Sequence, residues 1–128
     1  MNGLEAVADA IQQFEGWKPG TTSYTNRNPG NLRTGVNPDG NGYSVFPDFI
    51  SGYSALLREL QSKFSGNNAH GIGPSSTLLG LFNIYAPPSD DNPTNAYAQF
   101  VAQWVSKSLG KPITIDSELA NIWTLPSA

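Results

Sequence analysis

The chain of 128 residues has no cysteine and one histidine, and only 13% of its residues are charged. Without cysteine there is no disulfide, and a zinc site would have to combine His70 with carboxylates alone, which is not a usual zinc ligand set. No Walker loop, dinucleotide glycine fingerprint or Gly-x-Ser-x-Gly elbow is present. We therefore expect neither a metal nor a cofactor.

Long apolar runs and an excess of positive charge are also missing. No apolar run reaches 18 residues, so we expect no membrane insertion. The residues after Met1 show no cationic start and no apolar stretch, so we recognise no signal peptide. The net charge of −3 comes without a basic stripe, which argues against a nucleic-acid partner.

Glycine, proline and aromatic residues are plentiful. The 13 glycines and 10 prolines predict long structured loops, and the three Trp, five Tyr and six Phe are spread along the chain. This length suits one domain with a real core, so we expect residues 1–128 to form a single domain. We also expect a monomer.

Apolar spacing and capping residues predict a mainly helical fold. Helices are expected over residues 2–15, 48–64, from Ser75 or Ser76 to Tyr85, over residues 93–109 after an Asn92 cap, and from Asp116 onward. Residues 31–34 and 43–46 read as short strands around the turn-rich segment 35–42. The fold class is therefore α+β, with a helical domain and one small β-hairpin.

Glu15 is the strongest candidate for chemistry. It follows the apolar series Leu4, Val7, Ala8, Ile11 and Phe14, and by helical periodicity it points near the middle of that apolar arc. Burial and the negative end of a helix would both raise its pKa, and a proton held near neutral pH is what a general acid needs. The alternatives are an exposed glutamate at a helix end or one paired with Arg33 or Arg58.

Two polar segments could bind a ligand. Residues 26–33 read Asn-Arg-Asn-Pro-Gly-Asn-Leu-Arg, and their amides suit sugar hydroxyls and N-acetyl groups, although the same residues also make ordinary turns. Residues 85–92 are rigid and rich in acceptors, and Tyr85 and Tyr97 flank them. This segment could equally be a capped helix connection, and the tyrosines could be core residues. For Asp90 we favour the capping role.

The order of these motifs resembles a known family. Phe-Glu-Gly-Trp at residues 14–17 leads to Asn-Pro-Gly-Asn-Leu-Arg at 28–33, Tyr-Ser-Val-Phe-Pro at 43–47 and Gly-Tyr at 52–53. Tyr-Ala-Pro-Pro-Ser-Asp-Asp-Asn-Pro at 85–93 and then Tyr97 complete the series. The pattern, which covers residues 11–105, resembles lysozyme-superfamily domains of phage and bacterial cell-wall hydrolases, related to lytic transglycosylases and goose-type lysozymes.

The resemblance implies a helical fold whose cleft is closed on one side by the hairpin. It implies peptidoglycan glycan strands as the partner, the bond from N-acetylmuramic acid to N-acetylglucosamine as the target, and the bacterial cell wall as the place of action. Glu15 would be the catalytic acid, and Tyr85 takes the place at which related enzymes often keep a tyrosine close to the acid. The residues implied at the cleft or its sugar subsites are Asn28, Asn31, Arg33, Tyr43, Phe46, Tyr85, Asp91, Asn92 and Tyr97.

One departure concerns the second carboxylate that many glycosidases use. Asp39, Asp48 and Asp91 are available, but none stands in an obvious motif. Lytic transglycosylases work with one glutamate, because the muramic 6-hydroxyl is the internal nucleophile. We therefore expect a muramidase or a lytic transglycosylase, with a non-catalytic glycan-binding or phage structural domain as the alternative.

Overall fold

The computed structural model describes residues 2–123 and is mainly helical, as expected. Its elements are α1 (Gly3–Phe14), α2 (Thr22–Thr25), α3 (Phe49–Ser65), α4 (Leu78–Tyr85), the 3-10 helix η1 (Pro88–Asp90), α5 (Thr94–Leu109) and α6 (Leu119–Trp123). No helix in this part of the chain is long and apolar enough to cross a membrane.

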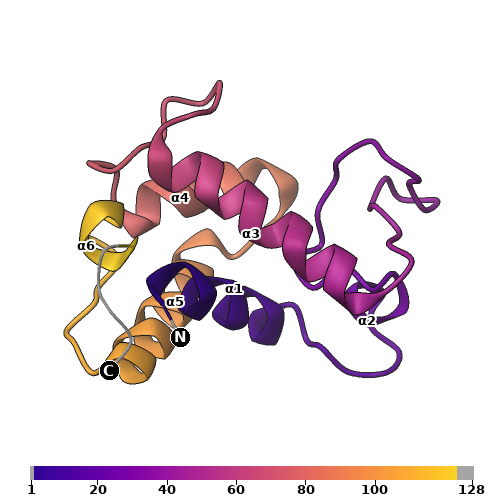
Figure 1. Cartoon of the computed structure of the whole chain (residues 1–128), viewed down its shortest axis with the longest axis horizontal. Helices are drawn as coiled ribbons and strands as arrows, with labels where there is room; N and C mark the ends of the chain where they lie inside the picture. Colours follow the sequence, from indigo (N-terminus) through magenta and orange to yellow (C-terminus); the bar gives the residue numbers. More distant parts are fainter. Residues whose placement is uncertain (1, 124–128) are drawn as a thin grey trace.

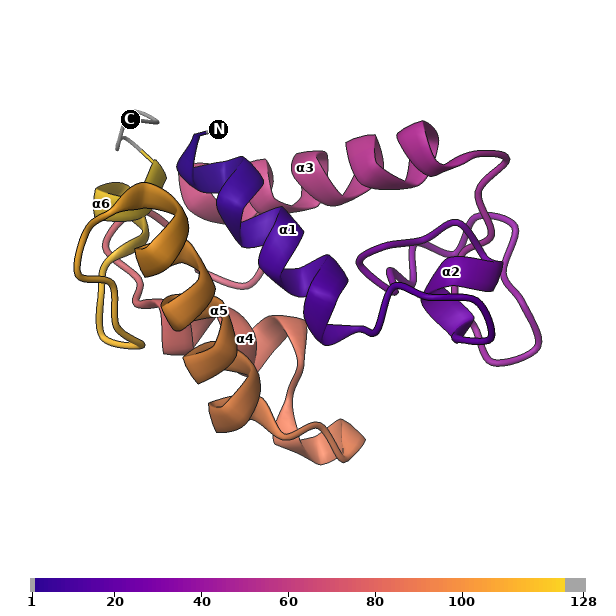
Figure 2. The same cartoon turned by 90° about the horizontal axis from the view of Figure 1, so that it is seen from below.

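Helix α1 is the central element, and it packs against both α3 and α5 (Figures 1 and 2). The side chains that the apolar spacing of this helix predicted as buried, from Leu4 to Ile11, lie in the core, while Phe14 at its end is half-buried. Tyr53 of α3 donates a hydrogen bond from its hydroxyl to Asp9 Oδ1 at 2.8 Å, which adds a polar link between α3 and α1. Helix α1 is therefore held from two sides.

Side-chain caps and glycines set several helix boundaries. Asn2 and Glu5 form a complete capping box at the start of α1. The Asp48 side chain accepts a hydrogen bond from the Ser51 N–H and caps α3. Gly66 and Gly110 adopt left-handed backbone conformations where α3 and α5 end.

Other boundaries differ from the prediction. Helix α4 is capped by Thr77 rather than by Ser75 or Ser76. Helix α5 begins at Thr94 without a side-chain cap, because the Asn92 amide donates to the Pro87 carbonyl instead. The short helices α2 and η1 were not predicted.

Helix α6 begins at Leu119, not near Asp116, because the preceding backbone is used elsewhere. The N–H groups of Leu78 and Leu79, at the start of α4, donate to the carbonyls of Ser117 and Ile115. These bonds satisfy N–H groups that a helix start leaves free. Residues 115–117 therefore serve α4 before the chain turns into a helix of its own.

The predicted β-hairpin is not confirmed, since residues 2–123 contain only isolated bridges and no strand. Its two segments do lie side by side, because the Ser44 N–H donates to the Leu32 carbonyl at 2.9 Å. Beyond this one bond, hydrogen bonds from polar side chains take the place of the backbone hydrogen bonds that a β-hairpin would form. The Thr34 N–H bonds to Ser44 Oγ, and the Asn28 amide bonds to the carbonyls of Leu32 and Ser44.

The segment of residues 16–47 projects from the helical body beside the start of α3 (Figure 2). An aromatic contact fastens it there, because the ring of Trp17 lies 5.0 Å from that of Tyr24 and 5.2 Å from that of Phe49. Phe49 itself is 39% exposed and packs on this segment. A second contact is closer still, because Gly52 of α3 lies directly against the backbone of Arg27.

We predict that Gly52→Ala destabilises the protein. An added Cβ would lie 2.0 Å from the Arg27 carbonyl oxygen, so the segment of residues 16–47 must move off α3. We expect the free energy of unfolding to fall by about 2 kcal/mol, although alanine favours helix by ~1 kcal/mol. Urea unfolding checks this, with Gly40→Ala as control because no atom lies within 4 Å of its added Cβ. Equal stability of the two variants would refute the prediction.

Candidate functional site

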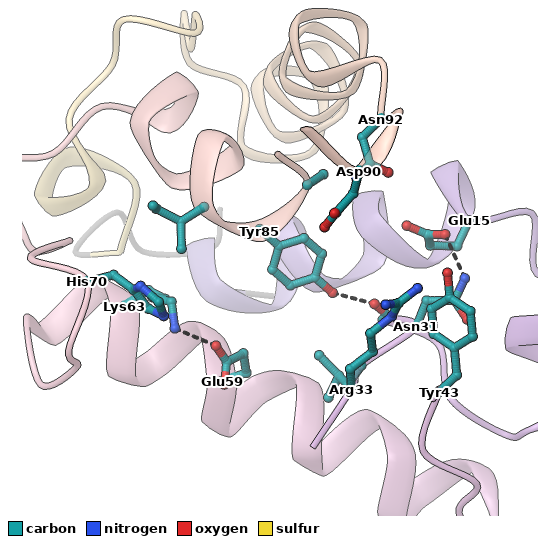
Figure 3. Close-up of a pocket in the computed structure, with 14 residues that line it drawn as sticks. Glu15, Asn31, Arg33, Tyr43, Glu59, Lys63, His70, Tyr85, Asp90 and Asn92 are labelled. Atoms are coloured by element: carbon teal, nitrogen blue, oxygen red, sulfur yellow. Dashed lines mark hydrogen bonds and ion pairs between the residues drawn. The ribbon is translucent and has the colours of Figure 1, made fainter. Parts of the chain in front are cut away.

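Glu15 is the residue directly after α1, and both of its carboxyl oxygens are hydrogen-bonded. Asn31 Nδ2 donates to Oε1 at 3.0 Å, and the Tyr97 hydroxyl donates to Oε2 at 2.7 Å (the Asn31 bond is drawn in Figure 3). Within residues 2–123 the only ion pair joins Lys63 and Glu59. Glu15 is therefore held by neutral donors, and it is paired with neither Arg33 nor Arg58.

The pKa of Glu15 is raised above its ordinary value. Burial is the main cause, and the hydrogen bonds from Tyr97 and Asn31 oppose it in part. The negative end of α1 acts in the same direction as burial. Burial was one of the two causes expected from the position of Glu15 in the sequence, and it favours a carboxyl group that retains its proton.

Tyr97 is a rigid donor to Glu15. Its ring is stacked between Phe14, at 4.0 Å between ring centroids, and Phe82, at 4.8 Å, and the residue is only 2% exposed. Burial also raises the pKa of its hydroxyl well above the ordinary value, so the hydroxyl remains protonated. α5 thus carries the group that fixes one oxygen of Glu15.

Tyr85 was the tyrosine expected close to the acid, but its hydroxyl bonds elsewhere. It donates to the Gly30 carbonyl at 2.6 Å and so fixes the loop that carries Asn31. An added Cβ at Gly30 would lie 2.7 Å from that hydroxyl, which explains why glycine occupies the position. Tyr85 therefore positions Glu15 indirectly, through Gly30 and Asn31.

Asn28 stabilises the same loop through hydrogen bonds to backbone groups. It is fully buried, and its amide group donates to the carbonyls of Leu32 and Ser44 and accepts from the Leu32 N–H. These bonds shape the backbone around Asn31, whose φ of 49° lies in the left-handed region that asparagine tolerates. Asn28 was expected to line the cleft, but it lies beneath the loop and stabilises the backbone there.

Glu15 opens onto a pocket of about 250 Å³ between α3, α4 and the loop of Asn31 (Figure 3). Its wall combines acidic, basic, amide and aromatic groups. The lining residues are Glu15, Gly30, Asn31, Leu32, Arg33, Tyr43, Glu59, Lys63, His70, Ile84, Tyr85, Ala86, Asp90 and Asn92. Residues 2–123 contain no group of His, Asp and Glu side chains suited to hold a metal ion.

Most of the candidate residues meet at this pocket. Besides Glu15, the predicted residues that line it are Asn31, Arg33, Tyr43, Tyr85 and Asn92. The guanidinium carbon of Arg33 lies 4.4 Å from the centroid of the Tyr43 ring, so these two side chains form one wall. Tyr97 reaches the site through its bond to Glu15 rather than as a lining residue.

Phe46 and Asp91 do not line the pocket. Phe46 is half-buried, and its N–H donates to the Asn26 carbonyl. Asp91 is exposed at the end of η1 with a left-handed φ of 59°, whereas its neighbour Asp90 lines the pocket. A sequence with two adjacent aspartates carries no signal that distinguishes them, because the turn of η1 decides which one faces inward.

Glu59, Lys63, His70 and Ile84 also line the pocket, and none was predicted as a site residue. Glu59 and Lys63 are spaced to pair on one helix face, which is a common surface pattern. Nothing in that spacing says that the face borders a pocket, and the sequence therefore gave no means of finding this pair.

Comparison with known proteins returns no match to a protein-family model, a curated protein or a solved structure. The function of the chain is therefore inferred from the pocket and its residues.

We predict that Tyr97→Phe raises the pKa of Glu15 further. The variant keeps the stacked ring but removes the hydrogen bond that most strongly opposes the effect of burial. Titration of the Glu15 carboxyl carbon by ¹³C NMR measures the shift. Tyr53→Phe is the matched control, because it removes a hydroxyl that bonds Asp9 instead. An unchanged or lower pKa in Tyr97→Phe would contradict the assigned role.

Proposed function

We propose that this chain is a lysozyme-like enzyme that cleaves the β-1,4 bond between N-acetylmuramic acid and N-acetylglucosamine in peptidoglycan. Glu15 is the general acid. One observation carries the proposal: a partly buried carboxyl group with a raised pKa, held by two neutral donors, opens onto a pocket lined with polar and aromatic groups. The order of motifs along the chain gives separate support.

In this mechanism Glu15 protonates the glycosidic oxygen as the bond breaks. The resulting carboxylate keeps its hydrogen bonds from Asn31 and Tyr97, which stabilise the anion inside the pocket. Each oxygen retains a further lone pair, so either one can hold the proton beside its existing bond. Glu15 then removes a proton from water or from the muramic 6-hydroxyl.

Asn31 supports a sugar as the ligand. Its amide nitrogen is engaged with Glu15, while its Oδ1 is buried and has no hydrogen-bond partner within residues 2–123. A buried acceptor without a partner is unfavourable, and an incoming N–H or O–H group would satisfy it. Acetamido and hydroxyl groups of an amino sugar provide such donors next to the acid.

The second step can follow either of two routes. Asp90 lines the pocket and supplies a second carboxylate that could activate water. Intramolecular attack by the 6-hydroxyl needs Glu15 alone, with no second carboxylate. Both routes use the same acid, and the products distinguish them.

A raised pKa for Glu15 favours an enzyme over a non-catalytic binding domain. Binding alone gains nothing from a buried carboxyl group, whose ionisation costs stability. Digestion of purified sacculi followed by mass spectrometry tests the choice. Anhydro-muramyl ends indicate transglycosylation, and reducing muramic ends indicate hydrolysis. Reducing glucosamine ends would refute the proposed bond, and no soluble fragments at any pH would support a binding domain.

We predict that Glu15→Gln lowers the rate at which sacculi are cleaved by about 10²-fold or more, because glutamine cannot deliver a proton. Glu118→Gln is the control, since Glu118 is exposed and lies outside the pocket. Fragment release from sacculi measures both variants. Wild-type turnover in Glu15→Gln would rule out the assigned acid.

We also predict that Glu15→Gln gains stability relative to the wild type as the pH rises from 4 to 7. The folded protein holds the Glu15 proton more strongly than the unfolded chain, whose pKa is about 4.3. This stabilising contribution is complete below the unfolded pKa and is lost as the pH rises through the folded pKa. Melting temperatures at both pH values measure the difference. A difference that stays constant or shrinks toward pH 7 would contradict a raised pKa.

A further inference from the structure

The end of the pocket opposite Glu15 carries a charge pair whose lysine is buried. Lys63 Nζ donates to Glu59 Oε1 at 2.5 Å, and the two residues are one turn apart on α3. The Lys63 side chain is only 7% exposed, whereas that of Glu59 is 39% exposed. In Figure 3 the pair lies on the other side of Tyr85 from Glu15, so the two ends of the pocket have different chemistry.

Lys63 retains donors for a further partner. An ammonium group has three N–H donors, and within residues 2–123 Glu59 is the only acceptor that bonds to it. A lysine this deeply buried is expensive to desolvate, and buried ion pairs add little net stability. An anionic group that enters the pocket would accept hydrogen bonds from the remaining N–H donors of Lys63. If the pair had only a structural role, these donors would have no use.

We propose that this end of the pocket is a carboxylate subsite, in which Lys63 binds the carboxylate of a sugar substituent and Glu59 holds the ammonium group when the subsite is empty. The identity of the sugar rests on the proposed function. Muramic acid differs from glucosamine by a 3-O-lactyl ether, and an unsubstituted lactyl group ends in a carboxylate. Lys63 therefore recognises the feature that distinguishes the two alternating sugars.

This subsite sets the register of the strand. The amide and hydroxyl groups near Glu15 recognise features that both sugars share. Arg33 at that end of the pocket is exposed to solvent, in contrast to the buried Lys63. A cation at one fixed end favours the register that places the muramyl sugar at that end. Lys63 thus decides which of the two alternating bonds lies at Glu15, and it acts as a specificity residue rather than a catalytic one.

Binding measurements on the full chain carrying Glu15→Gln test the subsite without turnover. The probes are a glucosaminyl–muramic acid disaccharide with a free lactyl carboxylate and the same disaccharide with the carboxylate converted to a methylamide. Calorimetry gives the affinity for each. We expect the carboxylate form to bind about tenfold more tightly, as for a hydrogen bond between charged groups.

The two members of the pair should respond in opposite directions. Lys63→Met removes the cation and should abolish the preference for the carboxylate. Glu59→Gln removes the competing carboxylate and should increase the preference above that of the parent. A merely structural ion pair would make both variants alike. If Lys63→Met does not fold, two other variants still test the subsite. Lys63→Arg should retain the preference for the carboxylate, and Glu59→Gln should increase it.

Cleavage of stem-free glycan strands provides the independent readout. In an active enzyme, Lys63→Met should shift the products from one class of newly formed chain end, reducing or anhydro, to a mixture of muramyl and glucosaminyl ends. If the protein prefers the carboxylate probe but the wild type cleaves nothing, the subsite proposal stands and the proposed enzymatic function is wrong. Cleavage with equal affinity for both probes, or with an unchanged product mixture in Lys63→Met, would overturn the subsite and keep the enzyme.

Discussion

The hydrogen bond from Tyr97 to Glu15 is the interaction on which the site depends. It joins α5 to the end of α1, across 82 residues of sequence, at a point where α1 and α5 already pack together. Asn31 holds the other oxygen from a loop that Tyr85 ties to α4. Three separate parts of the chain therefore fix one carboxyl group, and burial by the same packing raises its pKa.

Local signals in the sequence were sufficient for the helical framework. The Asn2–Glu5 capping box, the Asp48 cap and the terminal Gly66 and Gly110 each act within a few residues of themselves. Glu15 could be identified for the same reason, because helical periodicity alone directs it toward the core. These features depend on near neighbours along the chain, although another local feature, the Thr77 cap of α4, was missed.

Features decided by contacts distant in sequence were not. The hairpin was replaced by side-chain bonds from Asn28, Thr34 and Ser44, which compete with a backbone ladder. The bond from a tyrosine to the acid comes from Tyr97 instead of Tyr85, and this depends on where α4 and α5 pack. Asn28 for its part has the amide chemistry expected of a ligand-binding residue but uses it to shape the loop.

The aromatic column of Phe14, Tyr97 and Phe82 gives the core a second task, because its middle ring carries the donor to Glu15. A substitution that shifts these rings would therefore also shift the donor to Glu15 and change the geometry of the pocket. Engineering for heat tolerance should keep the three rings unchanged and introduce its substitutions at exposed positions outside the pocket. Natural drift in the sequence is subject to the same restriction, so these three interior positions cannot vary independently of the pocket.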